Sequence, residues 1–135
     1  MSEYITINVE YNDAECIKVT LKEMGYVFEE HNTEQSLYGY HGDARSQKAH
    51  IIIRRQHVGA AANDVGFRKT SNGNYEIIIS EYDQRQGSKS AENFLTKMRA
   101  IYTKHKHLKQ LKKMGKTITS VKTTADGKIK IKAIM

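Results

Sequence analysis

Apolar residues alternate with polar ones at the start of the chain and then recur at helical spacing. Residues 4–11 are rich in β-branched and aromatic side chains, and their alternation predicts a strand. Asn12 or Asp13 can cap a helix after it, because either side chain accepts hydrogen bonds from unpaired helix amides. Gly25 is placed to end that helix in a left-handed conformation. The predicted apolar face of the helix consists of Cys16, Ile17, Leu21 and Met24.

The pattern is less regular over the next part of the chain. Residues 26–28 are apolar and predict the start of a second strand. Residues 29–48 are polar, and the glycines among them indicate turns. Residues 49–55 include three consecutive isoleucines, which predicts a strand buried on both faces. Residues 56–63 contain one glycine and three alanines and predict a loop.

A hairpin is predicted around Asn72-Gly73, which lies between the apolar runs 65–68 and 75–79. Both central residues of such a turn tolerate positive φ, so an Asn-Gly pair between two apolar runs is a strong hairpin signal.

A long helix is predicted from Ser88 or Ser90 to Gly115. At about 100° per residue, Lys112 falls on its apolar face, where a straight helix would bury the ammonium group. We therefore expect a bend or break within residues 104–107. The shared apolar face consists of Phe94, Met98, Ile101 and Leu108.

Together these elements predict an α+β fold, with a mostly antiparallel sheet and two main helices in a single domain over residues 1–135. Residues 17–25 and 108–115 are alike, since both are lysine-containing helix ends that finish in Met-Gly before a strand. A duplicated β-α-β unit is therefore an alternative origin for this fold.

Composition limits where the protein acts. Cys16 is the only cysteine, so no internal disulfide forms, which fits a reducing compartment. We expect its thiol on the buried face of a helix. The first four residues lack the pattern of a signal peptide, and no apolar run approaches the roughly 20 residues that cross a bilayer. The expected location is the cytoplasm, without a membrane partner.

Charge separates the chain into two unequal parts. Residues 97–135 contain twelve Lys/Arg and one acid, a net charge of +11, whereas residues 1–96 contain ten Lys/Arg and fourteen acids, a net charge of −4. This asymmetry indicates a surface that meets an anionic partner.

The final hairpin is predicted to carry part of this surface. Residues 117–123 and 128–134 flank Ala125-Asp126-Gly127, which predicts two strands and a tight turn. Strand geometry then places Lys128, Lys130 and Lys132 on one face, where lysines neutralise phosphates without reading bases. Lys109 and Lys113 on the long helix are further candidate phosphate contacts. The alternatives are a solvated charged surface or an edge strand that lysines protect from sheet pairing.

Tyrosines in the first half of the chain could join the lysines in one nucleic-acid site, and arginines nearby suggest a separate pocket. Tyr38 and Tyr40 are two residues apart and could stack on bases, or they could form a rim around the core. A pocket for a small anionic nucleotide is a further hypothesis, lined by these tyrosines with Arg54, Arg55 and Arg68.

Catalytic and metal-binding patterns do not stand out. The groupings His41-Gly-Asp43 and His105-Lys-His107 lack the spacing that places two imidazoles on one helix face, and a single cysteine cannot build a thiolate cage. We expect His105 to contact the core or another helix. The prediction is a binding protein, without enzymatic activity, cofactor or metal.

An ordered series of short motifs spans most of the chain. It resembles the hypothetical chloroplast reading frame thirty-five family, a domain of unknown function in plastids, cyanobacteria, other bacteria and phages. The chain departs from the family pattern at residues 80–83, where the family usually has an Asp-Leu-Trp-like stretch. The motifs that carry the resemblance include Leu21-Lys-Glu-Met-Gly25, Tyr38-Gly-Tyr-His-Gly42, Ala49-His-Ile-Ile-Ile-Arg-Arg55, Asp64-Val-Gly-Phe67, Asn72-Gly-Asn-Tyr-Glu76, Ser90-Ala-Glu-Asn-Phe-Leu95, Tyr102-Thr-Lys-His105 and Asp126-Gly-Lys-Ile129.

The resemblance implies a single α+β domain that is often encoded beside AAA+ ATPases, and hence an adaptor role, but it implies no catalytic residue. Our first hypothesis from the residues is a module that binds nucleic acid or another polyanion. The alternatives are an adaptor on a protein such as an AAA+ ATPase and a self-assembling protein. For self-assembly, the net −6 of residues 1–34 would pair with the basic end of a second copy in a homo-oligomer.

Overall fold

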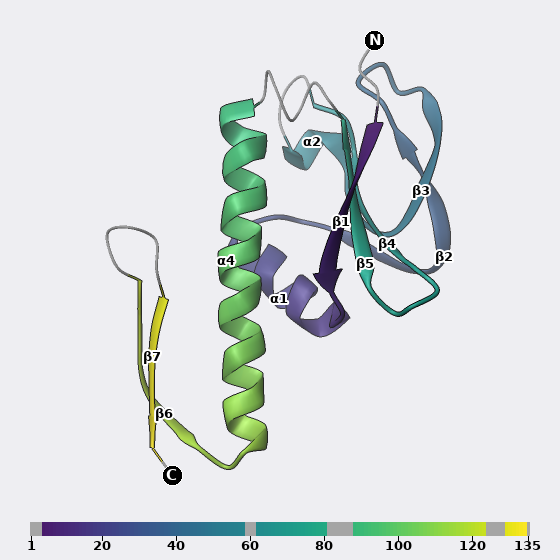
Figure 1. Ribbon diagram of the computed structural model, residues 1–135. Helices are drawn as coiled ribbons and strands as arrows, with labels where there is room; N and C mark the ends of the chain where they lie inside the picture. Colours follow the sequence, from purple (N-terminus) through teal and green to yellow (C-terminus); the bar gives the residue numbers. More distant parts are fainter. Residues whose placement is uncertain (1–3, 59–61, 81–87, 124–128, 135) are drawn as a thin grey trace.

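Figure 1 shows the computed structural model of the chain, which describes residues 4–58, 62–80, 88–123 and 129–134. Three features discussed above lie outside the described residues: the Asp126-Gly127 turn, Lys128 and residues 81–83. The elements are β1 (Tyr4–Tyr11), α1 (Ala14–Glu23), β2 (Glu29–Tyr38), β3 (Ala44–Ile53), α2 (Arg55–Val58), β4 (Val65–Lys69), β5 (Tyr75–Ser80), α4 (Ser88–Lys113), β6 (Thr117–Thr123) and β7 (Ile129–Ile134).

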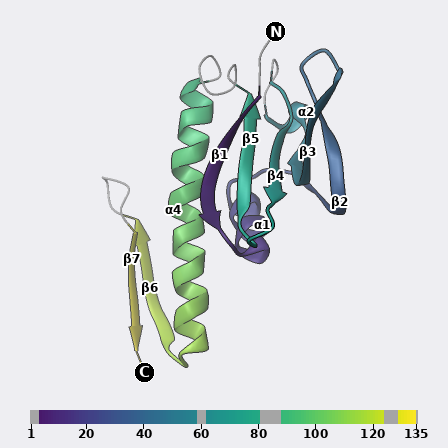
Figure 2. The same ribbon diagram turned by 45° about the vertical axis from the view of Figure 1, so that its right-hand side comes forward.

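Five strands form one antiparallel sheet in the order β1-β5-β4-β3-β2, with α1 and α4 against one of its faces (Figures 1 and 2). The predicted α+β class is confirmed. Cys16 is buried here as expected, and burial raises the pKa of its thiol. The core between helices and sheet consists of Tyr11, Cys16, Ile17, Leu21, Ile51, Ile53, Val65, Phe67, Ile77, Ile79, Phe94, Met98 and Tyr102.

Local signals in the sequence place the ends of both long helices. The side chain of Asp13 caps α1, because its Oδ1 accepts a hydrogen bond from the amide of Cys16 at 3.1 Å. Gly25 follows α1 with φ of 85° and Gly115 follows α4 with φ of 76°, values that a residue with a Cβ rarely adopts. These predictions are confirmed.

The predicted hairpin around Asn72-Gly73 is also confirmed, since it joins β4 to β5. Gly73 has φ of 89°, and the amide of Thr70 donates to the carbonyl oxygen of Asn74 across the turn at 2.8 Å.

The second strand was predicted incorrectly. It begins at Glu29 and not within residues 26–28, and the polar stretch 29–48 forms all of β2 and the first half of β3. An edge strand needs few apolar residues, because one edge and much of its surface face water. Residues 56–58, part of the stretch 56–63 that was predicted as a loop, belong to the short helix α2 together with Arg55, which was predicted to end the preceding strand.

The β2–β3 hairpin covers the face of the sheet opposite the helices. Its pairing is interrupted by register shifts, so the hairpin bends and brings Leu37 onto Gly66 of β4. A Cβ on Gly66 would lie 2.6 Å from the Cβ of Ala49, so only glycine fits. Leu37, Ala49, Ile52 and Ile78 form a second buried cluster. Because Ile51 and Ile53 belong to the first cluster, the isoleucine run of β3 is buried on both faces, as predicted.

Helix α4 is continuous from Ser88 to Lys113, so the expected interruption within residues 104–107 is wrong. Lys112 is exposed, because the C-terminal half of α4 extends past the five-stranded sheet (Figure 1). The prediction was wrong because the core does not follow the whole length of the helix.

A two-stranded antiparallel sheet, β6–β7, packs against this half of α4, on the side away from the five-stranded sheet (Figure 2). The arrangement argues against a duplicated unit. β1 and β2, which flank α1, lie in one sheet, whereas β5 and β6, which flank α4, lie in different sheets. Within the described residues, no helix is long and apolar enough to cross a membrane.

Candidate polyanion-binding surface

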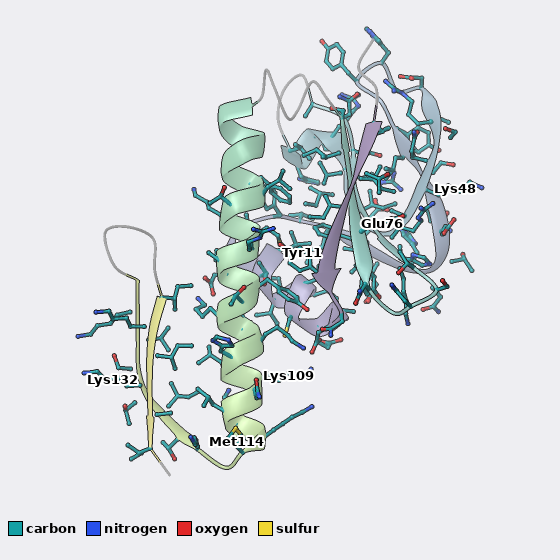
Figure 3. The ribbon with its side chains drawn as sticks, viewed as in Figure 1. Tyr11, Lys48, Glu76, Lys109, Met114 and Lys132 are labelled. Atoms are coloured by element: carbon teal, nitrogen blue, oxygen red, sulfur yellow. The ribbon has the colours of Figure 1, made fainter. Side chains whose placement is uncertain are left out.

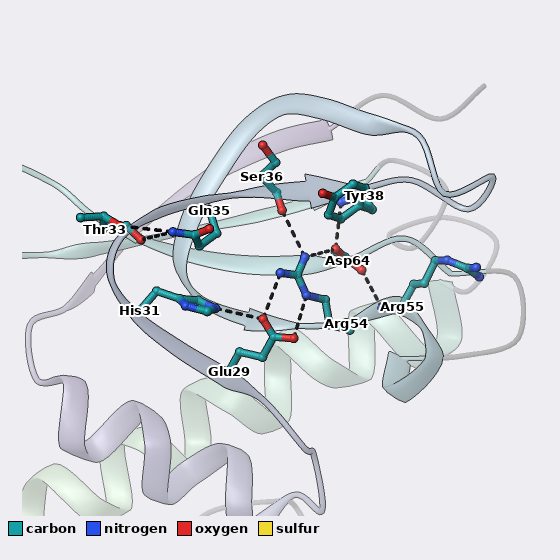
Figure 4. A network of polar contacts seen from close by, with 9 residues as sticks. All are labelled: Glu29, His31, Thr33, Gln35, Ser36, Tyr38, Arg54, Arg55 and Asp64. Carbon is teal, nitrogen blue, oxygen red and sulfur yellow. Dashed lines mark hydrogen bonds and ion pairs between the residues drawn. The ribbon is translucent and has the colours of Figure 1, made fainter.

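Arg54 is held by two acidic side chains on the β2–β3 side of the sheet (Figure 4). Its Nη1 donates to Asp64 Oδ2 at 2.8 Å, and its Nε and Nη2 donate to the two carboxylate oxygens of Glu29, each at 3.0 Å. The hydrogen bonds to Glu29 and Asp64 raise the pKa of Arg54 despite partial burial. The same guanidinium lowers the pKa of Glu29.

Asp64 fixes the end of the bent hairpin to the sheet. Its side chain is 1% exposed, and its two oxygens accept from the amides of Tyr38 at 2.8 Å and Arg55 at 2.7 Å, in addition to Arg54. The hydroxyl of Tyr4 donates to its backbone carbonyl at 2.9 Å. Such a satisfied buried network holds elements in place, and the guanidinium of Arg54 already donates four hydrogen bonds within it.

The other arginines of the hypothetical nucleotide pocket do not join Arg54. The Nε of Arg68 donates to Glu76 Oε1 at 2.6 Å, and the carboxylate of Glu76 is 10% exposed. Arg68 lies three residues beyond Val65 on β4, whereas Val65 is the strand partner of Ile53, next to Arg54. Arg55 lies half-buried in α2. The structure does not bring these arginines together in one pocket.

Tyr38 and Tyr40 lie at the β2–β3 turn and are 40% and 46% exposed. The guanidinium of Arg54 lies 5.5 Å from the ring centroid of Tyr38, and the ring of Tyr40 lies 5.0 Å from that of His41. In Figures 1 and 2 this turn and the β6–β7 hairpin are on opposite sides of α4. The tyrosines and the C-terminal lysines therefore do not form a single site.

The first lysines in the C-terminal half of α4 pair with acids of α1. Lys104 Nζ lies 2.6 Å from Glu23 Oε2, and His105 Nε2 lies 2.9 Å from Glu23 Oε1. Burial raises the pKa of Glu23, but these two partners outweigh it and the net shift is downward. His105 thus contacts another helix, as predicted.

Lys109 likewise pairs with an acid, at the N-terminal end of α1. It forms an ion pair with the capping carboxylate of Asp13, and the Nζ of Lys106 lies 3.9 Å from that carboxylate. Burial raises the pKa of Asp13, but the hydrogen bonds from Lys109 and from the amide of Cys16 outweigh it, so the pKa is lowered. Lys109 was predicted to contact a phosphate, but in the folded protein its ammonium group already pairs with Asp13.

Among the described lysines beyond Lys109, Lys116 is half-buried and the other five are exposed. The ammonium groups of six lysines have no hydrogen-bond or ion-pair partner among the described residues. These are Lys112, Lys113, Lys116, Lys122, Lys130 and Lys132.

Three of the six form what we name the hairpin lysine face, made of Lys122, Lys130 and Lys132. Lys122 is the strand partner of Lys130, and Ser120 is the partner of Lys132, so all three side chains lie on one face. Ile129 and Ile131 lie on the opposite face, toward α4. Figure 3 shows Lys132 pointing away from α4.

Lys122 was not among the candidate contacts chosen from the sequence. The signal for it was present, because the turn predicted at 125–127 would align Lys122 with Lys130, and these two residues are strand partners. Within the described residues, no group of three or more His, Cys, Asp or Glu side chains is placed to hold a metal ion.

Comparison with known proteins identifies the family. Residues 20–132 match DUF1257, a family described as proteins of unknown function, and the chain belongs to this family. No curated protein and no solved structure matches the chain.

Proposed function

We propose that the protein is a non-enzymatic module that binds nucleic acid through the hairpin lysine face and the neighbouring end of α4. The observation that carries the proposal is the set of six lysines without a partner among the described residues. Three are aligned on one face by the strand register, and Lys112, Lys113 and Lys116 lie where α4 leads into β6.

Lysine chemistry defines the mode of binding. Each ammonium group that neutralises a phosphate releases condensed counterions, so affinity falls steeply with salt. Lysine is a flexible point charge that holds a phosphate backbone without reading bases. Binding should therefore depend little on nucleotide sequence.

A salt series with two matched variants tests the proposal. Fluorescence anisotropy would measure binding of labelled mixed-sequence DNA and RNA between about 50 and 200 mM salt. Replacing Lys122, Lys130 and Lys132 by serine should weaken binding. It should also reduce the slope of log affinity against log salt by the equivalent of about two to three phosphate contacts. The control replaces three exposed lysines elsewhere, Lys22, Lys48 and Lys69, with the same loss of charge.

The control should retain most of the affinity. Equal losses in the two variants would mean that net charge, and not this surface, attracts the nucleic acid. Absence of binding at about 50 mM salt would contradict the proposal directly.

The resemblance to the chloroplast reading frame family suggests a second candidate function, that of an adaptor on an AAA+ ATPase. An acidic surface of such a partner would bind the same unpaired lysines. The nucleotide-pocket hypothesis has weaker support, because Arg54 and Arg68 already bind carboxylates.

A further inference from the structure

An open groove, lined mainly by apolar side chains, lies between α4 and β7. Its volume is about 400 Å³, within the size range of ligand-binding clefts. Met114, at the helical end of the groove, is 55% exposed. Burial of its apolar side chain by a ligand would be favourable. Figure 3 shows Met114 at the end of α4 that leads to the hairpin. The groove is lined by His107, Gln110, Leu111, Met114, Ile129 and Ile131.

One strand at the groove has an unpaired edge. Within the described part of the chain, β7 is hydrogen-bonded to β6 alone, so its second edge presents backbone donors and acceptors without strand partners. An extended peptide can pair with such an edge through main-chain hydrogen bonds, while its alternate side chains enter pockets beside the strand.

The side chains of β7 define what such a peptide must carry. Ile129 and Ile131 line the groove, whereas Lys130 and Lys132 lie on the other face and are exposed. Side chains of neighbouring strands on the same face lie within about 5.5 Å of each other, where opposite charges attract and like charges repel. A matching strand therefore alternates apolar residues toward the groove with acidic residues toward the lysines.

We propose that β7 binds an extended segment of a partner protein in which apolar and acidic residues alternate, and that this segment adds to the β6–β7 sheet as a third strand. The proposal goes beyond nucleic-acid binding, because it uses the apolar face and the edge of the hairpin. Acidic side chains of the segment lie beside Lys130 and Lys132, so peptide and nucleic acid compete.

A second copy of the chain is a poorer occupant of this edge. Pairing of β7 with β7 would bring Lys130 and Lys132 of one copy beside those of the other on the same face. Like charges on neighbouring strands destabilise pairing, which is how lysines guard edge strands. Charge complementarity thus favours an acidic partner segment.

The first experiment uses synthetic peptides with the full chain. The probe is a fluorescein-labelled eight-residue peptide that alternates valine and glutamate, measured by anisotropy without nucleic acid. Its control has the same composition with the valines and glutamates in separate blocks. The alternating peptide should bind about tenfold more tightly, because only it can place both residue types correctly.

Backbone methylation of the peptide distinguishes strand addition from other binding modes. Consecutive amides of a strand point to opposite edges, so N-methyl groups at odd or at even positions block one edge each. One methylated peptide should lose binding and the other should keep it. Equal binding of both would overturn the proposal.

Variants of the protein test the groove and the charges separately. Met114→Glu places a charge at the groove and should weaken binding about tenfold, whereas Val27→Glu alters an apolar residue that is 61% exposed and outside the groove lining and should have little effect. The double variant Lys130→Glu and Lys132→Glu should no longer bind the valine–glutamate peptide and should bind an alternating valine–lysine peptide instead. This exchange of specificity requires a folded hairpin, so a misfolded variant cannot produce it.

Two further results would overturn the proposal. A dimer in sedimentation equilibrium that Met114→Glu dissociates would mean that a second copy occupies the groove. Full binding of nucleic acid without binding of either alternating peptide would mean that the hairpin contacts phosphates alone. If the peptide binds and nucleic acid does not, this inference stands and the proposed function fails.

Discussion

Basic side chains have opposite roles in the five-stranded sheet and at the β6–β7 hairpin. Arg54 lies between β3 and α2, its side chain is 20% exposed, and it binds the carboxylates of Glu29 and Asp64. Lys130 and Lys132 of the hairpin are exposed and have no partner among the described residues. The difference shows that a count of charges does not identify a binding surface, because folding neutralises some cations and leaves others to a ligand.

The largest expected effect comes from Asp64→Ala in the first region. It would leave Arg54 partly buried without its most enclosed partner and would remove the acceptor of two backbone amides. We expect a loss of about 3–5 kcal/mol in the free energy of unfolding, measured by urea denaturation. Glu34→Ala, an exposed acid of the same hairpin, should change it by less than about 0.5 kcal/mol. Similar urea midpoints for the two variants would show that Asp64 does not stabilise the contact between the hairpin and the sheet.

Gly66→Ala tests the packing of the bent hairpin on the sheet. The added methyl group would lie 2.6 Å from the Cβ of Ala49, so we expect a loss of about 1–3 kcal/mol in the free energy of unfolding. Adding Ala49→Gly removes the clash and should recover part of that loss. A double variant no more stable than Gly66→Ala would show that this contact is not the cause.

The acids that bind basic residues predict a pH dependence. The pKa values of Asp13, Glu23 and Glu29 are lowered in the folded protein, so their contribution to stability is present above the ordinary carboxyl range of about 4. It is lost as the pH falls through that range toward the lower folded-state values. The urea midpoint should therefore decrease between about pH 6 and pH 3.

Asp13→Asn keeps a side chain that caps helices well but removes the charge that pairs with Lys109. Its urea midpoint should depend less on pH over the same interval. An unchanged dependence would show that Asp13 contributes nothing to it.

The smallest expected effect on stability is that of replacing Lys122, Lys130 and Lys132 by serine. Exposed lysines away from acids contribute little, so the free energy of unfolding should change by less than about 0.5 kcal/mol. A slight gain is expected where Lys122 no longer faces Lys130 across the strands. A large loss in urea denaturation would mean that the hairpin lysines support the fold, and the contrast between the two regions would fail.

The candidate site was partly visible in the sequence. Alternation of lysines with apolar residues in β7 predicted a cationic face, and Lys130 and Lys132 are exposed there. The sequence could not show that Tyr38 and Tyr40 lie apart from these lysines, because that depends on where the β2–β3 turn lies relative to α4. The pairing of Lys109 with Asp13 was equally hidden, since 96 residues separate them.

The sequence by itself determined the helix ends, the cap of α1 and the β4–β5 hairpin, because each depends on neighbours along the chain. Periodicity, a capping carboxylate and glycines at positive φ suffice for these features. Only the tertiary structure decided that the β2–β3 hairpin bends over Gly66, that α4 extends unbroken past the sheet and which cations remain without a partner. Those outcomes depend on contacts between distant segments, and a burial pattern along the chain does not specify them.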